Sequence, residues 1–407
     1  MKIQINKSIA NGVVNAQPSK SYAHRLLIAS CLSNNESIIE NVVLSNDILA
    51  TINCIKALGK EVIIEGNENK TLIIKKDKNF DLNSKEELIF DCNESGSTLR
   101  FFIPIALLLA KKVIFKGTKK LISRGIKVYE EICNKQNIQI IKEEDKITFI
   151  GKLQADNFNI EGNISSQFIT GLLFALPLLE EDSRILVTTK LESKNYVDIT
   201  IDVLKQFGIS IDIKNENEYY IVGNQEYSGL KCMVEGDYSN SAFLASLNYL
   251  DGNVSIKGLN ENSYQGDKRY IELFQELNNS YYECDITNCI DLGPILFCFA
   301  SLKHGGVFTG VKRLRIKESD RIKDIKEELE KFNIDFIEEE DKVIINNKHI
   351  SKPKDVLFGK NDHRIVMALS IMLTVYGGVI DGIEAVNKSY PSFFEDLKLL
   401  GVEVINV

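Results

Sequence analysis

Residues 94–109, ESGSTLRFFIPIALLL, join a polar opening to a segment that is apolar on every face of a helix. A helix with this pattern is expected to be buried on all sides. Each such segment is followed by a short β-branched strand, usually by an amphipathic helix, and then by two further strands. The pattern occurs six times, so the sequence predicts six βαβαββ-type units of about 70 residues each. The six polar openings lie at residues 18–21, 94–98, 165–167, 236–241, 291–293 and 361–364.

The number of units predicts the domain organisation. A chain of 407 residues exceeds what one hydrophobic core usually organises, so we expect an α/β protein of two similar domains with three units each. Polar residues interrupt the pattern before residues 227–231, which places a boundary there. A first strand at residues 2–6 and a turn around Gly12 precede the first complete unit. We therefore predict one domain at residues 15–229 and a second, which the chain re-enters, at residues 1–14 and 230–407.

The polar openings are candidate anion sites. The N-terminus of a helix offers unpaired N–H groups and the positive end of the helix dipole. The Ser, Thr, Asn and Asp residues in the openings are also ordinary helix caps, which is the simpler explanation for some of them. Capping does not explain the cations, because a positive charge at a helix N-terminus opposes the dipole. These cations are Lys20, Arg25, Arg100 and Arg364. We expect the six helix starts to converge on a cleft between the domains.

The stretch RIKESDR at residues 315–321 is the strongest candidate for acid/base chemistry. The spacing of the apolar residues, which follows the 3.6-residue period of a helix, predicts a helix from Arg315 onward. Its buried stripe is formed by Ile322, Ile325, Leu329 and Phe332. Glu318 falls on that stripe, with Lys317 and Arg321 beside it. A half-buried carboxylate near two cations suits proton transfer on an anionic substrate. The alternative is a solvated, charged first helical turn.

Composition excludes several classes of protein. The net charge of −8 argues against a nucleic-acid interface. Eight scattered cysteines without a CxxC pair predict reduced core residues of a cytoplasmic protein. Four single histidines predict no metal site, and we expect no cofactor. The longest apolar run, residues 101–110, is too short to span a membrane, and the start MKIQIN is not a signal peptide.

Nine motifs in order resemble one family. They are SKSxxxR at residues 19–25, SGSTLR at 95–100, Arg124 in a loop, SSQF from Ser165, SKNYVDIT from Ser193, VEGDYSNSAF from Val234, RIKESDR from Arg315, NDHR from Asn361 and NKSYPSFF from Asn387. Over essentially the whole chain they resemble the 5-enolpyruvylshikimate-3-phosphate synthases. The resemblance implies two domains of three repeated units with buried helices, an inside-out α/β barrel each, and an active site in the interdomain cleft.

The resemblance also implies a reaction. The family transfers the enolpyruvyl group of phosphoenolpyruvate to the 5-hydroxyl of shikimate 3-phosphate and releases phosphate, through a tetrahedral addition–elimination intermediate on the route to chorismate and the aromatic amino acids. It implies two small-molecule substrates as partners, no nucleic acid, no membrane and a monomer. Gly96 leaves room for glyphosate, the family's phosphoenolpyruvate-mimicking inhibitor.

The resemblance assigns roles to individual residues. Glu318 and Lys20 are expected to transfer protons, and Asp291 to contact the attacking hydroxyl. The expected phosphoenolpyruvate contacts are Lys20, Gly96, Arg124, Gln167, Arg321, Arg364 and Lys388. The expected shikimate 3-phosphate contacts are Lys20, Ser21, Arg25, Ser165, Ser166, Gln167, Ser193, Tyr196, Asp291 and Lys317. Further candidates are His363, Arg313 and Arg100.

Two other functions remain open at this point. The first is the sister enzyme, UDP-N-acetylglucosamine enolpyruvyl transferase, whose loop usually carries a cysteine. No cysteine lies between Cys92 and Cys133 in this chain, which disfavours that enzyme. The second is a non-catalytic phosphate-ligand or RNA-binding protein that uses the basic run at residues 312–315. Net acidity and the lack of aromatic residues among the basic ones disfavour this function.

Overall fold

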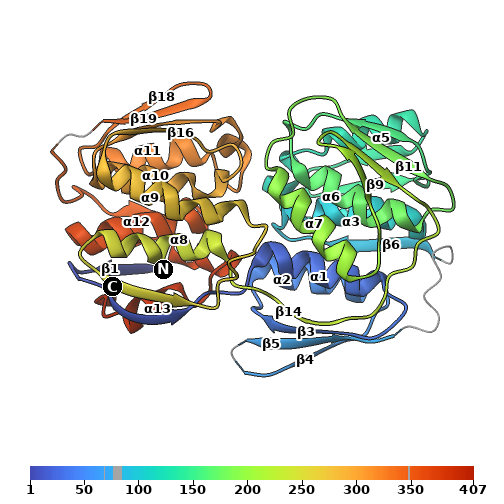
Figure 1. The fold of residues 1–407 in the computed structure, drawn as a ribbon, viewed down its shortest axis with the longest axis horizontal. Helices are drawn as coiled ribbons and strands as arrows, with labels where there is room; N and C mark the ends of the chain where they lie inside the picture. The colour runs from blue at the N-terminus through green and yellow to red at the C-terminus, as the bar shows by residue number, and fades with distance from the viewer. Residues whose placement is uncertain (68, 77–84, 347–348) are drawn as a thin grey trace. The chain divides into compact units, whose positions relative to one another are not determined.

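The computed structural model describes residues 1–67, 69–76, 85–346 and 349–407. The chain forms two compact units, each with its own hydrophobic core (Figure 1). Unit 1 contains Met1–Gln17 and Gly236–Val407, and unit 2 contains Pro18–Glu235. The chain therefore passes between the units after residues 17 and 235, whereas the sequence placed these points after residues 14 and 229.

The described residues of unit 2 form three four-stranded sheets of the same topology. In each sheet the first two strands are parallel, and the other two form an antiparallel hairpin that pairs with the second strand. In order across each sheet, the strands are β14 (Lys231–Met233), β3 (Ser37–Val42), β5 (Lys70–Ile74) and β4 (Val62–Glu65); β6 (Lys85–Asp91), β7 (Ala110–Lys116), β9 (Lys146–Ile150) and β8 (Gln139–Lys142); and β10 (Asn157–Ile160), β11 (Ser183–Val187), β13 (Glu218–Ile221) and β12 (Asp212–Asn215). These are the repeated units that the sequence predicts.

The apolar segments form the buried helices of unit 2. Parallel strands need a crossover, and α3 and α6 supply it for two of the sheets. A Cβ atom at Gly171 would lie 2.5 Å from the backbone oxygen of Arg100, so glycine allows α6 to approach α3 closely. The buried helices are α1 (Lys20–Leu32), α3 (Gly96–Leu109) and α6 (Ser166–Ala175). The other helices are α2 (Asn46–Ala57), α4 (Lys119–Ser123), α5 (Lys127–Lys135) and α7 (Lys194–Gln206), with a short 3-10 helix η1 (Leu176–Leu178).

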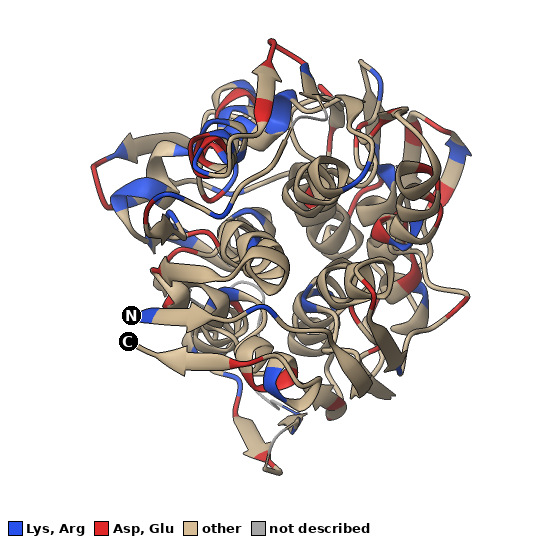
Figure 2. Ribbon diagram, turned by 90° about the vertical axis from the view of Figure 1, so that its left-hand side faces the viewer, with Lys and Arg blue, Asp and Glu red and all other residues tan. Residues whose placement is uncertain are grey.

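In the described part of unit 1, two of the three sheets repeat this topology. These sheets are β16 (Tyr282–Asp285), β17 (Gly306–Thr309), β19 (Lys342–Asn346) and β18 (Asp335–Glu338), and β20 (Leu357–Phe358), β21 (Gly378–Asp381), β1 (Lys2–Ile5) and β22 (Val404–Asn406). Because β1 pairs with β22, the two ends of the chain lie side by side (Figure 2). The third sheet has only β2 (Asn11–Asn15) and β15 (Asn253–Lys257), which are parallel.

The two-stranded sheet corrects two predictions. The hairpin expected after the amphipathic helix α9 (Tyr270–Asn279) is absent from residues 280–289, all described, where the one strand, β16, pairs with β17 of the neighbouring sheet, so five of the six units are complete. The predicted turn around Gly12 is also wrong, because Gly12 lies within β2 and pairs with Val254.

The helices of unit 1 follow the same division. The buried ones are α8 (Tyr238–Ser246), α10 (Gly293–Leu302) and α12 (His363–Tyr376). The others are α9 (Tyr270–Asn279), α11 (Arg321–Glu330) and α13 (Phe393–Leu399), with 3-10 helices η2 (Leu247–Tyr249), η3 (Gly266–Arg269), η4 (Ile290–Leu292), η5 (Lys312–Ile316) and η6 (Ile383–Lys388). Short segments that carry predicted site residues, such as η4 with Asp291, precede the buried helices.

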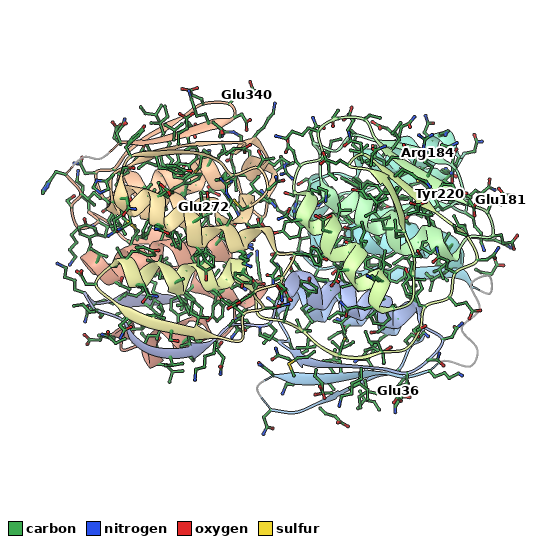
Figure 3. All side chains as sticks on the ribbon, in the orientation of Figure 1. Glu36, Glu181, Arg184, Tyr220, Glu272 and Glu340 are labelled. Atoms are coloured by element: carbon green, nitrogen blue, oxygen red, sulfur yellow. The ribbon has the colours of Figure 1, made fainter. Side chains whose placement is uncertain are left out.

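Charged residues concentrate on the outside of the units. Figure 2 shows mostly uncharged inner helices and charged outer elements. In Figure 3, Glu36, Glu181 and Glu340 lie at the edges of their units, and all three are exposed. None of the eight cysteines, which all lie in described segments, forms a disulfide, and seven are buried. Among the described helices, none has both the length and the apolar character of a membrane span.

Candidate active site

Unit 1 gathers six charged residues, which we call the Arg321 group. They come from η4, from the segment between η5 and α11, and from the starts of α11 and α12. Five of the six are predicted site residues, and the sixth, Asp362, is the cap of α12 and lies in the NDHR motif. The Arg321 group consists of Asp291, Lys317, Glu318, Arg321, Asp362 and Arg364.

The helix in this region begins later than the sequence predicts. It starts at Arg321 instead of Arg315, because Asp320 is its N-cap and accepts from the backbone N–H of Lys323 at 3.1 Å. Glu318 therefore lies before the helix and not on its buried stripe, and its side chain is 21% exposed. The stripe itself is confirmed, since Ile322, Ile325, Leu329 and Phe332 are all fully buried.

Arg321 is the centre of the group. Its side chain is 1% exposed and donates to three carboxylates. Nη1 donates to Asp291 Oδ1 at 2.9 Å, and Nη2 donates to Glu318 Oε2 at 2.5 Å. Nε donates to Asp362 Oδ2 at 2.8 Å. Burial alone would lower the pKa of this guanidinium, but the three carboxylates outweigh burial and raise that pKa. Arg321 is therefore a fixed positive charge.

Asp291 is held by three cations. Besides Arg321, its carboxylate contacts Lys317 Nζ at 3.1 Å and Arg364 Nη2 at 3.3 Å. Burial alone would raise the pKa of Asp291, but the cations, Arg364 first, outweigh burial and lower the pKa well below its ordinary value. Burial lowers the pKa of Lys317, and Asp291 offsets only part of this shift. Asp291 is thus an ionised carboxylate at neutral pH, surrounded by donors.

Arg364 is the second residue of the buried helix α12. Its backbone N–H donates to Asp362 Oδ1 at 2.9 Å, which caps the helix. Its Nη1 donates to the backbone oxygen of Asp291 at 3.1 Å and to the hydroxyl of Ser239. Arg321 and Arg364 therefore present two forked guanidinium groups on either side of one carboxylate, an arrangement that fits planar anions.

The other predicted residues of unit 1 lie on adjoining elements. Lys388, at the end of η6, is buried and donates to the backbone oxygen of Asn361, two residues before His363, at 2.7 Å. His363 is buried at the start of α12. Arg313, in η5, is buried and donates to the backbone oxygen of Thr287 at 2.9 Å.

Unit 2 brings four predicted residues into contact at the start of α3. Gly96 is the first residue of this helix, and an added Cβ would lie 2.9 Å from Arg124 Nη1 and 3.2 Å from Arg100 Nη1. Arg100 donates from Nη1 to Gln167 Oε1 at 2.7 Å. Gln167 in turn donates to Ser97 Oγ at 3.0 Å. Two guanidinium groups thus lie against a helix N-terminus, which is a suitable environment for a phosphate.

Arg25 lies in a second group of unit 2, between α1 and α7. It donates to Thr200 Oγ1 at 2.8 Å, to the backbone oxygen of Ser21 at 2.8 Å and to that of Tyr196 at 3.0 Å. Its guanidinium also lies 5.1 Å from the ring centre of Phe101. Burial lowers the pKa of Arg25 to about 10, so the side chain stays charged at neutral pH.

The remaining predicted residues of unit 2 lie at other helix starts. Lys20 begins α1 and contacts Asp47 Oδ2 at 3.0 Å. Ser165 caps α6 by accepting from the backbone N–H of Gln167, and Ser166 is the first residue of that helix. Ser193 precedes α7 with φ of 54°, a backbone conformation that is uncommon outside glycine and is often retained at functional sites.

Sequence reasoning missed three residues that contact the predicted ones. Asp47 pairs with Lys20, and Ser239 accepts from Arg364. Asp362, although part of the NDHR motif, was not singled out as a ligand of Arg321. Ser239 and Asp362 lie in two of the polar openings, so a signal was present for them. No local pattern marked Asp47. In the described part of the chain, no three His, Cys, Asp or Glu side chains are grouped so as to hold a metal ion.

The comparisons with known proteins agree with one another. A family model described as EPSP synthase (3-phosphoshikimate 1-carboxyvinyltransferase) matches residues 5–397. The 3-phosphoshikimate 1-carboxyvinyltransferase of Clostridium acetobutylicum is 43% identical over an alignment of 422 residues, covering 99% of this chain and 98% of that protein. The protein of the same name from Clostridium kluyveri is 41% identical over 423 residues, with 99% and 98% coverage.

Solved structures share the fold. An EPSP synthase structure from Acinetobacter baumannii matches with a TM-score of 0.77 and 21% identity, covering 100% of both chains. The enolpyruvyl transferase NikO from Streptomyces tendae matches with a TM-score of 0.75 and 12% identity, covering 99% of this chain and 98% of that one. At these identities the structures support the architecture alone.

Proposed function

The chain belongs to the EPSP synthase (3-phosphoshikimate 1-carboxyvinyltransferase) family, and we propose that the Arg321 group of unit 1, together with the residues around Arg25 and around Gly96 in unit 2, carries out its reaction. That reaction transfers the enolpyruvyl group of phosphoenolpyruvate to the 5-hydroxyl of shikimate 3-phosphate and releases phosphate, a step of aromatic biosynthesis. The observation that carries the proposal is the ionised Asp291 held among Lys317, Arg321 and Arg364.

The chemistry needs a partner for the attacking hydroxyl and a proton donor at the methylene carbon. Asp291 accepts the hydrogen bond of the 5-hydroxyl, because it is ionised and largely buried. Glu318 moves the proton at carbon 3 of phosphoenolpyruvate, together with Lys20. Arg321 and Arg364 bind the carboxylate of phosphoenolpyruvate. This substrate carboxylate competes with the carboxylate of Glu318 for the hydrogen bond from Nη2 of Arg321. Release of Glu318 from that ion pair frees it for proton transfer.

Residues of unit 2 bind most of the remaining charged groups of the substrates, namely the phosphates of both substrates and the carboxylate of shikimate 3-phosphate. The N-terminus of α3 at Gly96, with Arg124 and Gln167, binds the phosphate of phosphoenolpyruvate, and Lys388 of unit 1 adds a further positive charge. Arg25 and Ser21 bind the carboxylate of shikimate 3-phosphate. Its phosphate is bound by Ser165, Ser166, Ser193 and Tyr196, and Gln167 and Lys317 contact its ring. Gly96, Ser165, Ser166 and Ser193 precede or begin a helix, which supports their assignment to anion binding.

Two finer points of the proposal concern assembly and location. We place the protein in the cytoplasm, since its cysteines remain thiols. We also propose a monomer, because one chain supplies every residue assigned above. Light scattering on the purified protein at several concentrations tests this point, with a mass near 45.9 kDa expected and a dimer mass contradicting it.

The function is tested by phosphate release from phosphoenolpyruvate with two acceptors. Release is expected with shikimate 3-phosphate and not with UDP-N-acetylglucosamine. Release with the sugar nucleotide alone would identify the sister enzyme instead. No release with either acceptor, from protein shown to be folded, would favour a non-catalytic phosphate-ligand protein.

A further inference from the structure

Asp267 is a buried carboxyl group beside the Arg321 group. The proposed reaction assigns it no role. It lies in η3 and is 5% exposed. The preceding loop is fixed to the start of α8 by Gln265, whose Nε2 donates to the backbone oxygen of Gly236 at 2.8 Å. The Oε1 of Gln265 accepts from the backbone N–H of Tyr238 at 3.0 Å. Asp267 is therefore held in place by the same turn that opens α8.

Ser239 connects Asp267 to Arg364. The hydroxyl of Ser239 hydrogen-bonds the carboxyl group of Asp267 and accepts from Nη1 of Arg364. A hydroxyl has one proton to donate, and the arginine can only donate. The proton of Ser239 therefore points to Asp267, and its lone pairs point to Arg364. Asp267 thus sets the orientation of the hydroxyl that Arg364 uses.

Asp267 is also electrostatically linked to the site. Burial, followed by the nearby charge of Asp291, raises the pKa of Asp267 to about 7, and Arg364 offsets part of this shift. The other groups that face it are Asp237, the cap of α8, and Cys289 next to η4, whose own pKa is raised by burial and by Asp267. On its own side, Arg269 donates to the backbone oxygen of Asp285, and Tyr270 of α9 packs against Tyr238.

We propose that Asp267 is a positioning residue that aligns Arg364 through Ser239 and takes up a proton when the phosphoenolpyruvate carboxylate binds to Arg364. The inference rests on the function proposed above. An incoming anion adds negative charge beside Asp267 and Asp291, while Asp291 is kept ionised by three cations. Asp267 is the carboxyl group of this pair that accepts a proton, which comes from the solvent.

The test separates the hydrogen bond from the charge. Asp267→Asn retains an acceptor for Ser239 but cannot ionise, whereas Asp267→Ala loses both. We expect Asp267→Ala to lower kcat/KM for phosphoenolpyruvate about tenfold at pH 6, because a hydrogen bond to a charged network is lost. Asp267→Asn is expected to stay within about twofold of the wild type at that pH. The KM for shikimate 3-phosphate is expected to change by less than about twofold in both variants.

The pH profile shows the proton. With a pKa near 7, ionisation of Asp267 opposes anion binding as the pH rises. Between pH 6 and pH 8, kcat/KM for phosphoenolpyruvate of the wild type should fall about tenfold more than that of Asp267→Asn. Taking the ratio of the two proteins cancels the titration of the substrate and of the other site residues. Equal pH profiles would overturn the proposed proton uptake.

A matched control distinguishes this role from a structural one. Asp396 is also a partly buried carboxyl whose pKa burial raises, and it accepts from Tyr390 Oη at 2.8 Å and Ser392 Oγ at 3.2 Å. Asp396→Asn should leave both the kinetics and the pH profile unchanged. If Asp267→Ala fails to fold, Asp267→Asn alone decides the question. If the wild type turns over and the Asp267 variants have the same kinetics and pH profile as the wild type, only this inference is refuted. If the wild type does not turn over, the proposed function is refuted.

Discussion

Replacing Asp291 by asparagine changes the charge of the site while nearly preserving its shape. Asp291 accepts from Lys317 at 3.1 Å, from Arg321 at 2.9 Å and from Arg364 at 3.3 Å. An asparagine keeps one acceptor oxygen but turns an amide donor toward these cations. Arg321 retains two other carboxylates, so the guanidinium is still neutralised. We therefore expect a loss of about 1–3 kcal/mol in the free energy of unfolding, the range for removing one partner of charged hydrogen bonds.

The effect on catalysis should be larger than the effect on stability. The substituted amide cannot accept the proton of the attacking hydroxyl, and loss of a positioned acid/base group typically lowers kcat by about 10²–10⁴-fold. Stopped phosphate-release assays at saturating substrates measure kcat, and urea unfolding measures stability. The control is Asp335→Asn in β18, where the carboxylate accepts from Asn346 Nδ2 at 3.0 Å away from the site. A folded Asp291→Asn protein with kcat within about threefold of the wild type would refute the role given to Asp291.

The stability difference should also depend on pH. The folded-state pKa of Asp291 is depressed, so its stabilising contribution is fully present above the unfolded-state pKa of about 3.9. The contribution is lost as the pH falls below that value toward the folded-state pKa. Urea unfolding at pH 7 and at pH 3 should therefore show a smaller gap between wild type and Asp291→Asn at the lower pH. An equal gap at both values would show that the carboxylate charge does not stabilise the fold.

Three further changes test other parts of the site. Glu318→Gln should lower kcat at least about 10²-fold while leaving shikimate 3-phosphate binding nearly unchanged, and a near-normal rate would exclude Glu318 as the proton carrier. Gly96→Ala should raise the KM for phosphoenolpyruvate, because its Cβ would lie 2.9 Å from Arg124 Nη1, and an unaltered KM in steady-state kinetics would contradict this placement. Arg25→Lys should raise the KM for shikimate 3-phosphate about tenfold, since lysine cannot reproduce the forked guanidinium that contacts Thr200. An unchanged affinity for shikimate 3-phosphate in calorimetric titration would refute the role given to Arg25.

The sequence predicted most of the repeated architecture because its signals are local. A segment such as residues 96–109 is apolar on all faces, and burial of nearly every residue follows from that pattern alone. The hairpin predicted after α9 is absent because α9 ends at Asn279 and the next strand, β16, begins at Tyr282 and pairs with β17 of the neighbouring sheet. A local hydrophobic pattern does not show to which sheet such a strand belongs.

The structure brings several of the predicted residues together, but their contacts were only partly foreseeable from the sequence. The cations at helix starts were visible because they oppose the helix dipole. The predicted start of α11 was too early because a stripe of apolar residues does not show where the N-cap lies. Asp320 is the N-cap, so the helix begins at Arg321 and Glu318 lies outside it. The pairs Lys20–Asp47 and Arg364–Ser239 depend on tertiary packing, so sequence spacing could not reveal them.

In the function proposed here, this chain joins an enolpyruvyl group to shikimate 3-phosphate by means of the charged residues at its helix starts. A direct measurement is a single reaction of the purified protein with phosphoenolpyruvate and shikimate 3-phosphate. Colorimetry quantifies the released phosphate, and mass spectrometry quantifies the organic product. We predict one enolpyruvyl ether formed for each phosphate released, and none with Asp291→Asn on the same time scale. Phosphate release without the ether, or equal product from Asp291→Asn, would contradict the account.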